Sequence, residues 1–420
     1  MAQTVLGSLT LGYRPLWDRS RTLSGVQLFV HEDSEGVDGH HLLRMLAELR
    51  TAESPALLLS LQSRELLTSL LQHATPSDPM IEVPVRWLDD ARLRASVHSA
   101  RSRGVRMVAR GDAAQNPPED VARCFERRMT ALSAVDAGTA LHAAKRARES
   151  AAVGRLAARA EGSPVLPNSM VEGVASRALA EHALDQQGAW AIAGWPVEDA
   201  VHRYAGQPLP PSRRAIVQTM NALDDEPSLE RIEQLLGEEP TLAYRLLLYL
   251  NSAGLGLRSG IASLRHGFMM LGFRSLSAWL AEQLPHATDD AGLRPVNATM
   301  VLRGHLMEHL MDAGIEDDLR REVYLCGLFA QLDLVLDEPL KLSLSRIPLS
   351  ERIVSAIVSH NGPYAPSLKA ALALESDDPA PLRAVRETYG LASDDVNRAL
   401  LRMLAGSSLQ PAGLLTTRAA

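Results

Sequence analysis

The sequence predicts an α/β domain followed by an all-α domain, on three observations. Apolar segments with strand-like alternation are interleaved with helical segments over about the first 200 residues. The run 206–212, GQPLPPS, contains three prolines that block helix continuation and mark a boundary. Beyond this run, the apolar residues recur only at helical spacing. The expected limits are 1–205 for the α/β domain, 206–405 for the helical domain and 406–420 for a flexible tail.

The first half alternates strands and helices in order. Residues 8–31 predict two strands joined by a polar turn. The segments that follow predict in turn a helix (40–52), a strand (56–63), a helix (64–74), a strand (80–85), a helix (89–103) and a strand (105–110). Because parallel strands need crossover helices between them, this order predicts a parallel sheet.

Three short helices open the second half, between Asp225 and Leu276. Gly237 to Pro240 breaks the first helix, and Asn251 with Gly254 ends the second. The third carries apolar residues at a spacing of three and four and is closed by Gly272. This pattern predicts a compact helical packing unit.

Composition restricts the class of protein. The net charge of −7 and the dispersed basic residues argue against a nucleic acid partner. Only Cys124 and Cys326 occur, which fits a reducing cytosol, and we expect a cytoplasmic protein. The N-terminal segment does not have the pattern of a signal peptide, and no apolar run is long enough to predict a membrane span.

Two ordered motifs in the second half carry a specific resemblance. LLLYLNSAGLG at 246–256 is followed by GIASLRHGFMMLG at 260–272. Their order resembles the HDOD domain, a helical relative of the HD phosphohydrolases, and the similarity continues to about Asp378. The resemblance implies bacterial signal transduction through protein partners.

The first half resembles the EAL domain, through the strand–helix order and the opening YRPLWD at 13–18. The resemblance implies a modified TIM barrel that hydrolyses cyclic di-GMP with divalent metals. Residues 130–160 fit it least, because this stretch is rich in alanine and arginine and predicts helix. The sequence leaves open whether the stretch replaces a barrel element or extends outside the barrel.

The metal ligands that the EAL resemblance implies are missing here. A two-metal site needs several converging carboxylates. The ligand positions are filled by Gln27, Ser60, Val85, Arg110 and Gly111, and only Glu82 keeps an acidic side chain. Since a cation at position 110 repels a metal ion, we expect a degenerate EAL-like domain without hydrolase activity.

The HD-type ligands are also missing. The adjacent His-Asp pair of that class falls on Ala330 and Gln331. His305 and His309 stand four residues apart on one predicted helix, so they are the candidate metal ligands that remain. With no third ligand placed by the sequence, two ordinary histidines are the favoured interpretation, and we expect no metal or other cofactor.

The favoured hypothesis is a non-catalytic adaptor that acts by binding protein partners. The candidate contact residues are Trp195, Asn251, Ser252, Leu255 and His266. One alternative is a sensor that binds cyclic di-GMP without cleaving it, with Arg14 and Arg110 facing phosphates. A second alternative is an HD-type phosphohydrolase that uses His305 and His309.

Overall fold

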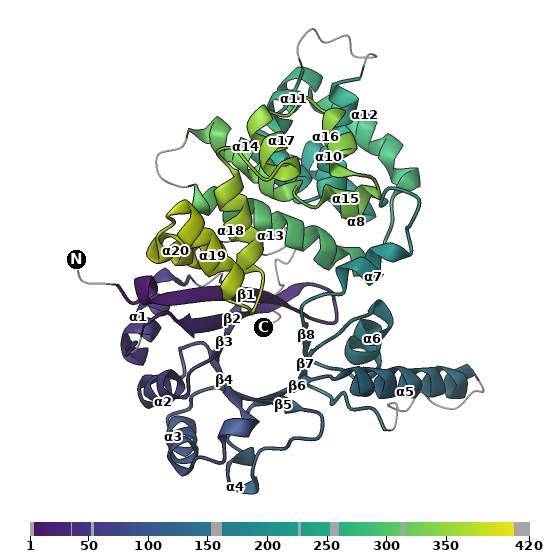
Figure 1. Cartoon of the computed structure of the whole chain (residues 1–420). Helices are drawn as coiled ribbons and strands as arrows, with labels where there is room; N and C mark the ends of the chain where they lie inside the picture. Colours follow the sequence, from purple (N-terminus) through teal and green to yellow (C-terminus); the bar gives the residue numbers. More distant parts are fainter. Residues whose placement is uncertain are drawn as a thin grey trace. The chain divides into compact units, whose positions relative to one another are not determined.

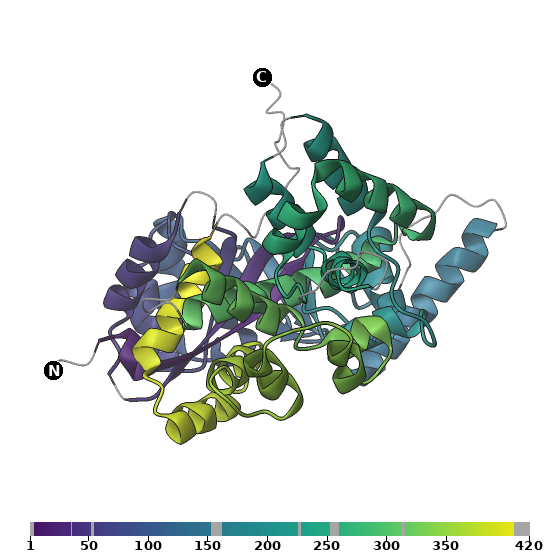
Figure 2. The same cartoon turned by 90° about the horizontal axis from the view of Figure 1, so that it is seen from above.

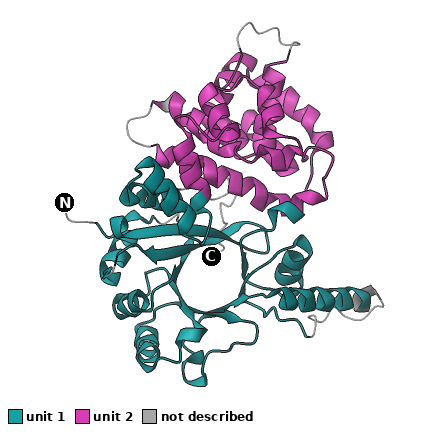
Figure 3. Ribbon diagram, viewed as in Figure 1, with its two compact units in different colours: residues 1–199, 373–414 teal, residues 200–372, 415–420 magenta. Residues whose placement is uncertain are grey.

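The computed structural model describes residues 4–34, 36–51, 54–152, 162–225, 228–252, 260–311 and 316–406. These residues divide into two compact units (Figure 3). The barrel unit contains the described residues up to Asp199 together with those from Ala373 onward, and the helical unit contains the described residues from Ala200 to Leu372. The predicted fold class, a barrel-like α/β domain followed by helices, is confirmed.

Eight strands close into a barrel in sequence order (Figure 1). They are β1 (Leu9–Trp17), β2 (Leu23–Glu32), β3 (Ala56–Leu61), β4 (Met80–Pro84), β5 (Met107–Asp112), β6 (Arg127–Ala131), β7 (Met170–Glu172) and β8 (Ala191–Ala193). β1 runs antiparallel to both of its neighbours, β2 and β8, whereas the neighbours from β2 to β8 pair in parallel. The barrel is therefore a TIM-like barrel with its first strand reversed.

Crossover helices connect the parallel strands. They are α1 (Gly39–Leu49), α2 (Arg64–His73), α3 (Ala91–Ser102), α4 (Glu119–Ala122), α5 (Ala134–Ala152) and α6 (Arg177–Glu181). The short turn η1 (Leu6–Ser8) precedes β1, η2 (Val85–Trp87) precedes α3 and η3 (His182–Gln186) follows α6. Asp38, Ser63 and Asp90 accept hydrogen bonds from backbone N–H groups in the first turns of α1, α2 and α3. Capping of this kind fixes where each helix begins after its strand.

Residues 134–152 of the alanine-rich stretch form α5, which follows β6 and precedes β7, and residues 153–160 lie outside the described residues. It is therefore a crossover helix and replaces no strand of the barrel. Figures 1 and 2 both show its length directed away from the barrel wall. Because most of such a helix has no neighbour to pack against, its alanine content rather than a wide apolar face favours helix formation here.

Two helices near the C-terminus belong to the barrel unit, which differs from the expected domain limits. The expected helical domain ran to residue 405, whereas α19 (Ala380–Tyr389) and α20 (Ser393–Ala405) group with the barrel. α20 packs against η1, β1 and α1 (Figure 2). The side chain of Asn397 is buried and bonds the backbone of the first strand region: Nδ2 donates to the Leu6 and Leu9 carbonyls at 2.8 and 2.9 Å, and Oδ1 accepts from the Leu11 N–H at 3.2 Å.

The carboxylate of Asp33 ties the same helices to the barrel. Asp33, just after β2, pairs with Arg383 at 2.7 Å and with Arg386 at 3.0 Å, and both arginines lie on α19. Thr10 on β1 also donates to this carboxylate at 2.8 Å. Helical spacing in the sequence indicated these helices but not which domain they cover, because their partners lie 350 or more residues away in the chain.

The helical unit consists of short helices joined by tight turns. They are α8 (Arg213–Asp224), α9 (Leu229–Gly237), α10 (Pro240–Leu250), α11 (Leu264–Leu271), α12 (Phe273–Gln283), α13 (Arg294–Leu310), α14 (Asp317–Leu328), α15 (Leu332–Leu336), α16 (Leu340–Ser345) and α17 (Glu351–Val358), with η5 (Leu284–His286) and η6 (Ala291–Leu293) between α12 and α13. The chain passes from the barrel unit to the helical unit within α7 (Val197–His202), and it returns to the barrel unit within α18 (Ala365–Leu374). Within the described ranges, we find no helix with the length and apolar character to cross a membrane.

Close approach of α13 and α14 builds the centre of the helical unit. A Cβ atom placed on Gly327 would lie 2.6 Å from the Arg303 carbonyl oxygen, and one on Gly304 would lie 2.7 Å from the Tyr324 ring. Glycine at both positions therefore lets the two helices pack closely enough to bury Arg303 completely.

Candidate functional site

The inward side chains of the barrel form two layers. The lower layer is apolar and contains inward residues of seven strands, among them Leu16, Leu58, Met80 and Val108. Alternation along the strands then directs the residues two positions further on toward the barrel axis as well. On β3, β4, β5 and β7 those residues are polar or charged, namely Ser60, Glu82, Arg110 and Glu172. They form the layer nearer the carboxyl ends of the parallel strands, where barrel enzymes place their catalytic groups.

Three strands meet in a buried polar group. The Nε2 atom of Gln27 on β2 donates to Ser60 Oγ on β3 and to Glu82 Oε2 on β4, both at 3.0 Å. Ser60 Oγ also donates to Glu82 Oε2. Gln27 and Ser60 are fully buried and Glu82 is 2% exposed. Burial raises the pKa of Glu82, and the Arg110 guanidinium and these two hydrogen bonds offset part of that rise.

Arg110 on β5 joins this group to the opposite wall. Its Nε and Nη2 atoms lie 2.8 and 2.7 Å from Glu172 Oε1 at the end of β7, and its Nη1 atom lies 3.6 Å from Glu82 Oε1. Burial alone would lower the pKa of Arg110, but the two carboxylates outweigh it and raise this pKa. The guanidinium therefore carries its charge between Glu82 and Glu172, the carboxylates that would otherwise attract a metal ion.

Two further positions that the EAL resemblance assigns to metal ligands, Val85 and Gly111, have side chains without oxygen atoms. Val85 begins the turn η2 just beyond β4 and is half-buried, and Gly111 on β5 is buried. Among the residues that the structure describes, no three His, Cys, Asp or Glu side chains form a group suited to a metal ion.

A backbone segment enters the mouth of the barrel beside β1. Gly12 has the same inward orientation as Leu16, and a Cβ atom placed on it would lie 2.1 Å from the carbonyl oxygen of Ser376. The next residue, Asp377, pairs with Arg14 at 3.2 Å, and Arg14 also lies 3.7 Å from Glu172. Residues 376–377 thus occupy the space above the polar layer on the side of β1.

Ala330 and Gln331, the positions at which HD phosphohydrolases carry their His-Asp pair, lie in a break between two helices. The sequence predicts one helix over 319–337, whereas α14 ends at Leu328 and α15 begins at Leu332. Ala330 and Gln331 fall in this break and are half-buried. Gln331 Oε1 accepts a hydrogen bond of 2.9 Å from the buried Arg303, so this position also faces a guanidinium.

His305 and His309 have different surroundings. His305 Nδ1 lies 2.8 Å from Glu308 Oε2 and its ring lies 5.0 Å from the Tyr324 ring, centroid to centroid. His305 lines a cavity that is described below, and His309 is not among the residues that line it. The structure therefore does not bring the two histidines together at one cavity.

Asn251 has a structural task in the helical unit. Its Nδ2 atom donates to the Leu247 and Ile261 carbonyls at 2.7 and 2.8 Å, and its Oδ1 atom accepts from the Ile261 N–H at 2.7 Å. These bonds close the end of α10 onto the segment that precedes α11. The amide is engaged within the chain, so its use as a contact residue stays a prediction without support from this geometry.

The other candidate contact residues are spread over the chain. Trp195 belongs to the barrel unit and is half-buried, and Ser252 is exposed with its hydroxyl donating to the Tyr249 carbonyl at 2.7 Å. His266 on α11 is exposed and lines the cavity. Leu255 lies outside the described residues.

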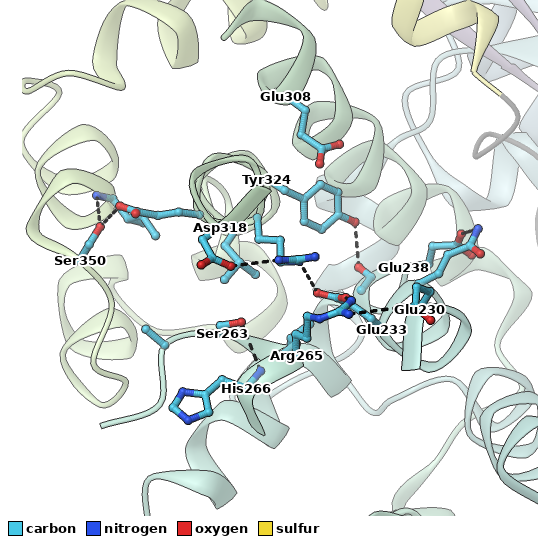
Figure 4. A pocket seen from close by; sticks show the side chains of 18 of the residues that line it. Glu230, Glu233, Glu238, Ser263, Arg265, His266, Glu308, Asp318, Tyr324 and Ser350 are labelled. Carbon is cyan, nitrogen blue, oxygen red and sulfur yellow. Dashed lines mark hydrogen bonds and ion pairs between the residues drawn. The ribbon is translucent and has the colours of Figure 1, made fainter. Parts of the chain in front are cut away.

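The helical unit contains a cavity of about 600 Å³ (Figure 4). Its walls come from α9, α11, α13 and α14, with the N-terminus of α17 closing one side. Six carboxylates line it, namely Glu230, Glu233, Glu238, Glu308, Asp318 and Glu322. Only two guanidinium groups, Arg265 and Arg321, line it as well.

Sequence reasoning missed the cavity and one barrel residue. The carboxylates of the cavity come from three helices, and no spacing along the chain shows that they converge. Glu172 ends a strand of only three residues, too short for a periodic signal. An acidic residue directly after an apolar pair, Met170 and Val171, was the one available sign.

Comparisons with known proteins bear on both units. Residues 208–336 match the model of the HDOD domain, which covers the helical unit from just before α8 to α15. Uncharacterized protein YuxH of Bacillus subtilis is 22% identical over 165 residues, 38% of this chain and 40% of that protein. Cyclic di-GMP phosphodiesterase CdgJ of Vibrio cholerae is 24% identical over 143 residues, 32% of this chain and 31% of that protein. The matches thus span well under half the length of these relatives.

Among solved structures, the complex of Klebsiella pneumoniae BlrP1 with manganese and cyclic di-GMP is similar at a TM-score of 0.29 and 13% identity. That similarity covers 45% of this chain and 55% of the BlrP1 chain.

Proposed function

Because residues 208–336 form an HDOD domain behind a closed barrel, we propose that this chain is a non-catalytic signalling adaptor that acts in the cytosol through protein partners. Its pathway is of the cyclic di-GMP type, in line with the similarity to a phosphodiesterase of that name. The barrel serves as a folded platform, and the HDOD domain supplies the contact surface.

The position of Arg110 is the observation that carries the non-catalytic part. Two-metal hydrolysis requires carboxylates that are free to bind cations. Here Glu82 and Glu172 share one guanidinium at 3.6 and 2.7 Å, inside a layer of nearly buried side chains. A divalent cation in the same space would meet the positive charge of Arg110 at short range.

The mouth of the barrel gives a second, independent line of support. Ser376 and Asp377 lie against Gly12 and Arg14, on the inner side of β1. A dinucleotide that approaches the polar layer would have to displace this segment and separate Arg14 from Asp377. Arg14 and Arg110, the two arginines suited to phosphates, are both paired with carboxylates already.

Turnover of cyclic di-GMP by the purified full chain tests the proposal. The protein is incubated with cyclic di-GMP and either Mn²⁺ or Mg²⁺, and the products are separated by ion-pair chromatography beside an active phosphodiesterase as a control. We expect no linear dinucleotide. Metal-dependent appearance of the linear product would overturn the non-catalytic assignment.

Two further measurements separate the adaptor from its alternatives. Calorimetric titration with cyclic di-GMP is expected to show no heat of binding, and saturable binding without cleavage would favour the nucleotide sensor. Metal analysis of the protein as purified is expected to show no stoichiometric transition metal, whereas one bound equivalent would return His305 and His309 to consideration as HD-type ligands.

A further inference from the structure

The cavity of the helical unit carries an excess of negative charge that its own arginines only partly balance. Arg265 pairs with Glu230 at 3.1 Å and with Glu233 at 3.3 Å. Arg321 pairs with the same Glu233 at 3.0 Å and with Asp318 at 3.0 Å. The two guanidinium groups that line the cavity are thus shared among three carboxylates on one side of it.

The carboxylates at the other side have different partners. Glu322 is held by Arg352 on α17, at 2.7 Å. Glu238 accepts a hydrogen bond of 3.0 Å from Gln234, and Glu308 lies 2.8 Å from Nδ1 of His305. The ion pairs found among the described residues therefore assign no arginine or lysine to Glu238 or Glu308.

An aromatic residue lies between these two carboxylates. The Tyr324 hydroxyl donates to the Gly237 carbonyl at 2.9 Å, and Figure 4 shows its ring between Glu308 and the segment of Glu238. Burial raises the pKa of Tyr324 well above its ordinary value, and the charges of Glu238 and Glu308 add to this rise. Burial also raises the pKa of Glu238, and the Gln234 hydrogen bond and the charges of His305 and Arg231 offset part of this rise. Because the Glu238 carboxylate is poorly solvated, a cation bound beside it would be favoured.

His305 completes this end of the cavity. Its Nδ1 atom faces Glu308, and its Nε2 atom is buried with no hydrogen-bond partner in the described part of the chain. His305 and Glu308 therefore present an imidazole and a carboxylate side by side at this end of the cavity. A guanidinium or ammonium group offers several N–H donors and a positive charge, and an aromatic wall such as Tyr324 adds cation–π attraction.

The rim adds apolar surface beside the charge. Met269 on α11 lines the cavity and is 62% exposed, and its neighbour Met270 is 55% exposed. Flexible methionines at the edge of a pocket can pack against the apolar residues of a protein segment. A small free amine has no apolar group to make this contact.

From these contacts, we propose that the cavity receives an arginine or lysine side chain of a partner protein. The cationic head lies among Glu238, Glu308, His305 and Tyr324, and an adjacent apolar residue of the partner lies on Met269 and Met270. This inference rests on the proposed adaptor function and names the chemistry of the partner segment.

Fluorescence anisotropy with labelled peptides tests the inference on the full chain. The probe is a short peptide of alternating arginine and leucine, compared with the same peptide in which citrulline replaces arginine. Citrulline keeps the shape of the side chain and removes its charge. We expect saturable binding of the arginine peptide and binding at least about tenfold weaker for the citrulline peptide. Equal binding of the two peptides would overturn the inference.

Two matched double variants locate the binding site. Glu238→Gln with Glu308→Gln removes two charges from the cavity, and Asp224→Asn with Asp289→Asn removes two charges from exposed positions of the same unit. We expect at least about a tenfold loss of arginine-peptide affinity in the first variant and less than about a twofold change in the second. An equal loss in both would show general attraction to an acidic protein and would refute the site.

A third variant guards against loss of fold. Met269→Gln makes an exposed rim residue polar without adding charge, so we expect the thermal transition of the chain to stay in place while binding of the leucine-containing peptide weakens. Unchanged binding in both the Glu238/Glu308 variant and the Met269 variant would remove this site and leave the adaptor function to another surface. Cyclic di-GMP turnover, in contrast, would remove the adaptor function and leave the peptide result unaffected.

Discussion

Replacement of Arg110 by methionine gives a direct measure of what the guanidinium does in the barrel. Methionine keeps an unbranched side chain of comparable length and removes the charge and the donors. In the parent chain, Nε and Nη2 of Arg110 lie 2.8 and 2.7 Å from Glu172, and Nη1 lies 3.6 Å from Glu82. The variant leaves Glu82 and Glu172 buried at 2% and 5% exposure, so two carboxylates lose their common counter-charge.

The size of the effect follows from these contacts. Removing one partner of a buried ion pair costs roughly 3–5 kcal/mol. Arg14 still lies 3.7 Å from Glu172 and Arg110 is 28% exposed, which both reduce the loss. We therefore expect Arg110→Met to lower the free energy of unfolding of the barrel unit by about 2–4 kcal/mol at pH 7.

Tryptophan fluorescence during urea unfolding is a suitable assay, because four of the five tryptophans, at 17, 87, 190 and 195, belong to the barrel unit. The control is Arg44→Met, whose pair with Glu48 is exposed and should change stability by less than about 0.5 kcal/mol. If Arg110→Met is as stable as the control, the guanidinium does not compensate the two carboxylates and the reasoning is refuted.

The pH dependence of the stability loss in Arg110→Met tests the same reasoning, because its direction can be predicted. Burial raises the pKa of Glu82 in the folded state, and loss of Arg110 raises it further. A folded-state pKa above the unfolded value means that the folded protein binds the proton more tightly, so this carboxyl destabilises the fold as the pH rises. The deficit of Arg110→Met should therefore shrink as the pH falls toward the raised pKa of Glu82. A deficit that grows on acidification would contradict this account.

Three further outcomes are expected. Asp33→Asn should destabilise the barrel unit by about 1–3 kcal/mol at pH 7. Hydrogen bonds from Thr10 and two arginines outweigh burial and lower the pKa of Asp33 in the folded state. The stabilisation is therefore present above the unfolded pKa and lost as the pH falls through the folded pKa, so urea titrations of parent and variant should converge in acid. Asn397→Leu should cost roughly 2–4 kcal/mol by leaving the β1 backbone groups unpaired, read as an earlier tryptophan transition. Gly12→Val should displace the segment at Ser376 and speed protease cleavage there, detected by mass spectrometry, whereas an unchanged digestion pattern would place that segment away from β1.

The fold class could be predicted from the sequence, because long periodic segments identify most of the strands and helices. Strands such as 56–61 and 80–84 fall within their predicted ranges, since each is a continuous apolar run between turn signals. β7 and β8 contain three residues each, and no periodicity exists at that length. Closure of the barrel through these strands was implied by resemblance and became visible only in the structure.

The contacts within the candidate site could not be predicted from residue types. Alignment to a family pattern identified Gln27, Ser60 and Arg110 as substitutions of acidic or amide ligands. It gave no indication that Arg110 pairs with Glu172, because that contact joins residues 62 positions apart. In the same way, the spacing of His305 and His309 suggested a shared ligand site, whereas the structure pairs His305 with Glu308.

The two units share one physical feature that bears on their function. In the barrel, Arg110 lies between Glu82 and Glu172. In the helical unit, the fully buried Arg303 bonds Gln331, one of the two positions at which HD-type enzymes carry a metal ligand. A guanidinium fixed by the protein is a permanent cation, so it supplies local charge balance without an exchangeable ion. It cannot activate a water molecule as a metal does, and this difference supports the non-catalytic role that we propose.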